Sequence, residues 1–121
     1  MCKLIALDVG GRTVNVANIK TEYIRNIIDN AFRCNAIEKI VLFGSALEER
    51  CTDESDIDIA IFGKETKNKV FKSKSYRDYI NSVVSFGNLQ DYDILYFDMT
   101  KQYDSEIMND INNGQILFER Q

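Results

Sequence analysis

The residues of this chain best suited to chemistry are a Gly-Ser pair and two aspartates near its centre. Gly44 and Ser45 end one apolar run, and after ten intervening residues Asp56 and Asp58 interrupt the start of a second. Side chains two residues apart on a strand share one face, with Cα atoms about 6.6 Å apart. Because two converging carboxylates repel each other unless they share a proton or hold a cation, the aspartates predict a metal-binding site.

The Gly-Ser pair adds a place for an anion beside those carboxylates. A strand that ends at Gly-Ser and turns into a helix leaves backbone N–H groups that favour a negative charge. Phosphates on backbone amides and Mg²⁺ on aspartates are the two halves of a metal–nucleotide site. The alternative is structural: Ser55 and Asp56 would close a turn, and Asp58 would lie on an exposed strand edge.

Together these motifs resemble the signature of the DNA polymerase β-like nucleotidyltransferase superfamily. More narrowly, residues 21–118 resemble the minimal nucleotidyltransferases of prokaryotes, which are often encoded beside a HEPN-domain protein. In that family a later strand supplies a third carboxylate. Asp93, which opens the apolar run 94–97, is the better match, and Asp91 is the second choice because it would share the same face of a longer strand.

The resemblance implies transfer of a nucleoside monophosphate from a nucleoside triphosphate to a hydroxyl, with ATP the expected nucleotide. Asp56, Asp58 and Asp93 would be the catalytic residues and would hold two Mg²⁺ ions about 3.5–4 Å apart. The residues that the resemblance assigns to nucleotide binding are Gly44, Ser45 and Ser55. The acceptor would be a tyrosine or a short RNA end on a partner, and a HEPN-type toxin is the partner that the resemblance implies, with this chain as its antitoxin.

A second hypothesis comes from a different class of protein. Glu48 and Glu49 occupy loop positions that many relatives fill with a basic residue and a glycine, and acids there would repel a triphosphate unless they face solvent. The chain would then be a non-catalytic nucleotidyltransferase-like module that acts as a stoichiometric antitoxin or assembly subunit. Neither hypothesis fixes the oligomeric state, and a homo-oligomer remains open.

Composition narrows the classes of function further. The chain has no histidine, which excludes Ser-His-Asp and Cys-His catalysis and histidine-ligated zinc. Three widely spaced cysteines without a C-x-x-C pair predict free thiols: Cys2, Cys34 and Cys51. A net charge of −4 argues against broad nucleic-acid binding. No apolar run approaches the roughly 20 residues that cross a bilayer, and Asp8 comes too early for a signal peptide, so we expect a cytoplasmic protein.

The elements expected to position these residues form an α/β (α+β) domain over residues 1–121. A hairpin over residues 1–19, with Gly10 and Gly11 at its turn, precedes a family core over residues 21–118 that begins with a helix. We expect a single mixed sheet flanked by helices. The predicted core strands are 39–43, 56–62, 92–97 and 115–118. The predicted later helices are 46–50, 75–86 and 102–112, with a flexible basic connection over 63–69.

Overall fold

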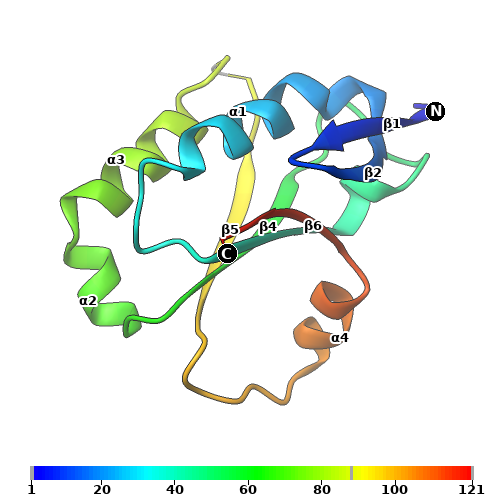
Figure 1. The fold of residues 1–121 in the computed structure, drawn as a ribbon. Coiled ribbons are helices and arrows are strands. Elements are labelled where there is room, and N and C mark those ends of the chain that lie inside the picture. The colour runs from blue at the N-terminus through cyan, green and yellow to red at the C-terminus, as the bar shows by residue number, and fades with distance from the viewer. Residues whose placement is uncertain (1, 88, 121) are drawn as a thin grey trace.

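The computed structural model describes residues 2–87 and 89–120 and begins with a β-hairpin (Figure 1). Strands β1 (Leu4–Val9) and β2 (Arg12–Ala17) pair antiparallel and form a sheet of their own. Gly10 and Gly11 make the turn with φ of 56° and 85°, a conformation that glycine adopts without a steric penalty. The predicted hairpin is therefore confirmed, and it does not extend the main sheet.

The main sheet has four strands in the order β5-β4-β3-β6. Strand β3 (Lys39–Phe43) pairs antiparallel with both β4 (Ile57–Gly63) and β6 (Gln115–Glu119). Strand β5 (Tyr92–Asp98) runs parallel to β4, so the sheet is mixed. This mixed sheet, flanked by helices and preceded by a hairpin, confirms the fold class predicted from the sequence.

Helices α1 (Thr21–Ala31) and α3 (Lys74–Val84) cover one face of the sheet. The apolar stripe of α1 is buried there, as its spacing of three and four residues predicts. Tyr79 of α3 donates its hydroxyl proton to the carbonyl of Ile27 in α1 at 2.7 Å, which ties the two helices together. This layer contains the larger hydrophobic core of the protein.

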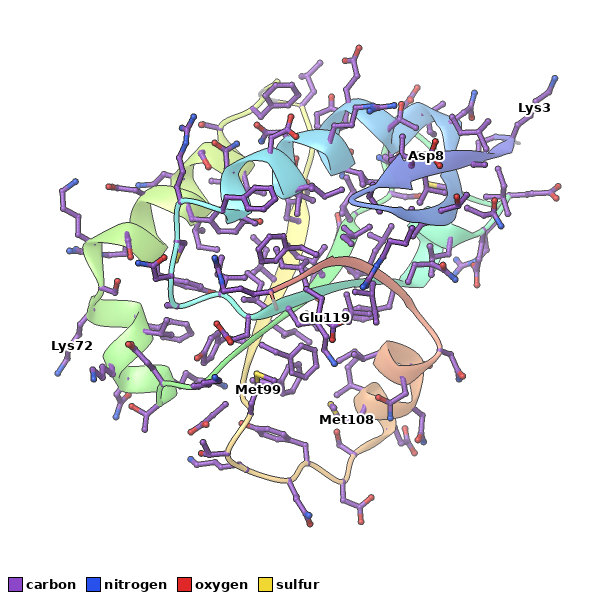
Figure 2. All side chains as sticks on the ribbon, viewed as in Figure 1. Lys3, Asp8, Lys72, Met99, Met108 and Glu119 are labelled. Atoms are coloured by element: carbon purple, nitrogen blue, oxygen red, sulfur yellow. The ribbon has the colours of Figure 1, made fainter. Side chains whose placement is uncertain are left out.

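The opposite face of the sheet is covered by α4 (Glu106–Asn112) (Figure 1). Ile111 of α4 packs against Val41, Ala60 and Phe97, and Met108 projects from the same helix toward this smaller cluster (Figure 2). No helix in the described part of the chain is long and apolar enough to cross a membrane.

Three expectations about local structure were wrong. Part of the segment expected to be flexible forms a helix, α2 (Lys67–Lys72), because Thr66 caps its N-terminus and accepts a hydrogen bond from the backbone N–H of Lys69. The helix expected over 46–50 is instead a 3-10 helix, η2 (Gly44–Leu47), which begins at the glycine itself. The helix expected over 102–112 begins only at Glu106, because Asp98 accepts hydrogen bonds from Thr100 in a turn after β5 and residues 102–104 form no regular structure.

Candidate functional site

The register of three strands brings the predicted residues to one end of the main sheet. Asp58, the second residue of β4, is paired with Asp93 of the parallel strand β5. On its other side Asp58 is paired with Phe43, the last residue of β3, and Gly44 follows directly. Because side chains alternate along a strand, Asp58 and Asp93 lie on the same face as Ala60, the face of α4.

Gly44 lies against the Asp58 carboxylate. Its φ is 80°, and a Cβ atom at this position would collide with one carboxylate oxygen of Asp58 and lie 3.1 Å from its Cγ. Only glycine combines this φ with so close an approach. Gly44, at the start of the Gly-Ser turn, is therefore in direct contact with Asp58 of the acidic motif.

Asp56 and the two serines lie beside this contact. The strand begins at Ile57 rather than at Asp56, so the exposed Asp56 lies in the connection just before it. Ser45 donates from its hydroxyl to the backbone carbonyl of Asp56 at 3.5 Å. Ser55 accepts a hydrogen bond from the N–H of Thr52 at 3.0 Å and so closes a turn. A phosphate contact of Ser55, the other role considered for it, stays a prediction.

Asp58 carries the electrostatic effect of both of the other predicted catalytic acids. The pKa of Asp58 is raised to about 6, first by its burial and then by the negative charges of Asp93 and Asp56. Asp91, the second choice for the third carboxylate, lies before β5 and uses its backbone carbonyl to accept the N–H of Ile57 at 3.1 Å. Of Asp91 and Asp93, it is therefore Asp93 whose charge acts on Asp58.

The candidate ligands at this site are chemically suited to Mg²⁺. They are carboxylate oxygens, the ligands of a hard divalent cation, and the carboxylates of Asp56 and Asp93 are open to solvent. Among residues 2–87 and 89–120, no three acidic, histidine or cysteine side chains converge closely enough to enclose an ion by themselves. Mutual repulsion of the carboxylates opposes such convergence, and a bound cation would remove that repulsion.

The acids of the connecting loop, Glu48 and Glu49, are exposed to solvent. Glu48 forms an ion pair with Arg50.

Cys2, Cys34 and Cys51 are all free thiols in the described chain, as the sequence predicted. A cavity of about 510 Å³ lies between the hairpin, α1 and β6, and because no predicted site residue lines it, it carries no information about this site.

Two residues beside the site had no signal in the sequence. Lys20 and Gln90 are almost completely buried and bond to each other and to the segments that lead into Asp56 and Asp93. Buried lysines are rare, and neither residue belongs to a periodic pattern or a motif. The contacts of Lys20 join positions 33 to 70 residues apart, which no local pattern encodes.

The mixed sheet thus brings the paired aspartates beside the Gly-Ser turn. The family model described as "Polymerase beta, Nucleotidyltransferase" matches residues 22–121, and the chain belongs to this family. The match supports nucleotidyltransferase function in general and confirms the resemblance to the superfamily. A comparison with curated proteins gave no match.

Proposed function

We propose that this protein is a Mg²⁺-dependent nucleotidyltransferase that moves a nucleoside monophosphate from a nucleoside triphosphate, with ATP as the expected donor, to a hydroxyl. The observation that supports this most strongly is the placement of Asp58. Its carboxylate is half-buried between the Gly44 backbone and the paired Asp93. A carboxylate in that position destabilises the protein unless a cation joins it, so a structural role gives no reason for it.

Each residue has a distinct part in this reaction. Asp56, Asp58 and Asp93 would hold two Mg²⁺ ions, and these ions would supply positive charge beside the triphosphate and the attacking hydroxyl. Gly44 lets the backbone approach the phosphates, and Ser45 donates from its N–H and its hydroxyl. As the hydroxyl oxygen bonds to the α-phosphorus, the bond to the bridging oxygen breaks and pyrophosphate leaves. Asp93, on the exposed side of the cluster, accepts the hydroxyl proton.

The acceptor in this proposal is a hydroxyl on a protein tyrosine or a short RNA end, presented by a HEPN-type toxin in the cytoplasm. The chain would then be its antitoxin. Two features of the sequence support a protein-bound acceptor. The net charge of −4 suits a partner with basic patches rather than free nucleic acid, and the match leaves no room for a separate acceptor-binding domain within these residues.

The test is label transfer from α-labelled nucleoside triphosphates and Mg²⁺ in extract of the host cell. Wild type is compared with Asp58→Asn and with Asp110→Asn, a matched control that neutralises an exposed aspartate on α4. We expect one labelled protein or RNA band with wild type and Asp110→Asn, and loss of at least 100-fold with Asp58→Asn, since removing an electrostatic group from a catalytic site has effects on the order of 10²–10³.

Equal labelling by wild type and Asp58→Asn would refute the assignment of the site. Absence of labelling by wild type, with nucleotide binding measured separately, would instead favour the non-catalytic antitoxin or assembly subunit.

A further inference from the structure

We infer that Lys20 is a positioning residue of this site: its buried ammonium group forms hydrogen bonds with both of the segments that carry Asp56 and Asp93. The inference rests on the proposed function, because it assigns a role in holding the carboxylates that this function uses. Lys20 lies in a 3-10 turn (Asn18–Lys20) between the hairpin and α1, two residues before the family match begins. The match and the motifs of the family core do not include it.

The contacts of Lys20 reach both segments. Its side chain is about 1% exposed, and Nζ donates to the backbone carbonyls of Asp53 at 3.3 Å and Ser55 at 2.8 Å. Ser55 directly precedes Asp56, and Asp53 lies three residues before it. Nζ also donates to the side-chain oxygen of Gln90 at 2.5 Å, and Gln90 begins the segment that leads to Asp93. The ammonium group of Lys20 thus bonds to the backbone just before Asp56 and to the side chain of Gln90, three residues before Asp93.

The amide nitrogen of the Gln90 side chain adds two more hydrogen bonds to the same segments. This N–H₂ group donates to the carbonyl of Ser55 at 2.9 Å and to that of Asp91 at 2.6 Å. The carbonyl of Asp91 also accepts the N–H of Ile57 at 3.1 Å. The segments 53–57 and 90–91 are therefore joined directly by two bonds, from Gln90 to Ser55 and from Ile57 to Asp91, and indirectly by the three bonds of Lys20. Moving either segment would move a carboxylate relative to Asp58.

An ammonium group suits this position for a specific reason. It has three N–H donors and no acceptor, and it meets three oxygens. Within residues 2–87 and 89–120, Lys20 forms no ion pair with a carboxylate, so its charge is compensated by carbonyl dipoles and by the acidic segments around it. A neutral side chain of similar length would leave the Asp53 carbonyl without this donor and the Gln90 side-chain oxygen buried and unpaired.

The test compares Lys20→Met with two matched controls. Tyr79→Phe removes a different buried bond from side chain to backbone, between α1 and α3 and away from the carboxylates. Lys74→Met removes the same charge from an exposed pair with Asp78. Two quantities are measured well below each variant's melting temperature. They are amide hydrogen exchange of residues 52–58 and 90–95, and the Kd for the Mn²⁺ complex of α,β-methylene-ATP.

For Lys20→Met we expect faster exchange confined to those two segments and a Kd raised about tenfold, the lower end of the effect of residues that orient metal ligands. Tyr79→Phe should lower the melting temperature while leaving the Kd unchanged, and Lys74→Met should change neither by much. A Lys20→Met protein with wild-type Kd, or with exchange raised throughout, would overturn the positioning role while leaving the proposed function standing. Failure of wild type to bind the Mn²⁺ complex more tightly than Asp58→Asn would overturn the proposed function, and the positioning role with it.

Discussion

Strand β4 presents two different surfaces. Ile57, Ile59 and Ile61 point toward α1 and α3 and are completely buried, whereas Asp58 and Ala60 point toward the face of α4, with Asp58 next to solvent at the strand start. The isoleucines stabilise the fold by removing apolar surface from water. Asp58 opposes folding, since its carboxylate is half-buried between two other acids. One strand therefore separates the residues that stabilise the protein from those that we propose perform its chemistry.

This separation predicts that substitutions on the two surfaces change different quantities. Changes on the isoleucine face should lower the free energy of unfolding, and changes at Asp58 should lower transfer activity while leaving the fold intact.

The largest effect is expected for Ile59→Ala on the helix-covered face. The side chain is 0% exposed, and truncation of a buried isoleucine destabilises by about 2–5 kcal/mol through lost burial and the cavity left behind. Urea denaturation should show this loss, and the remaining folded protein should bind the nucleotide complex with unchanged Kd. A loss below about 1 kcal/mol would contradict the assignment of this face as the main source of stability.

Gly44→Ala should affect both quantities. The left-handed φ costs an alanine about 1–2 kcal/mol, and the new Cβ would displace the Asp58 carboxylate. Transfer activity should therefore fall steeply. Gly10→Ala is the matched control, since Gly10 also has positive φ but has open space around its Cβ position. Equal activity of the two variants would show that close approach at Gly44 is unimportant.

The sequence predicted the local features of the site better than the contacts between distant segments. The spacing of Asp56 and Asp58 predicted that the two aspartates share one face, and such a period of two is a local property of a strand. The pairing of Asp58 with Asp93 depends on the register between two strands over thirty residues apart, so the sequence left Asp91 as an alternative. The bonds of Lys20 are equally non-local. Helix α2 was missed because its three lysines resembled a solvated loop.

The pH dependence of stability should distinguish Asp58 from an ordinary surface aspartate. The pKa of Asp58 in the folded protein is about 6, above its usual value of 3.8, so the folded state binds a proton more tightly than the unfolded state. This contribution to stability is complete below pH 3.8 and is lost as the pH rises through 6. The free energy of unfolding of wild type relative to Asp58→Asn should therefore fall across that range in metal-free urea titrations. A difference that is constant, or that rises with pH, would contradict the raised pKa.

The central claim is that Asp58 is kept for a bound cation and its nucleotide at the expense of stability. The most direct measurement is the free energy of unfolding of wild type and Asp58→Asn at pH 7.5, each with and without the Mn²⁺ complex of α,β-methylene-ATP. Without the complex, Asp58→Asn should be more stable by about 1 kcal/mol, the repulsion discounted for partial exposure. With the complex, wild type should gain stability and Asp58→Asn should gain little. Lower stability of Asp58→Asn without the complex, together with an equal gain for both proteins, would contradict the claim.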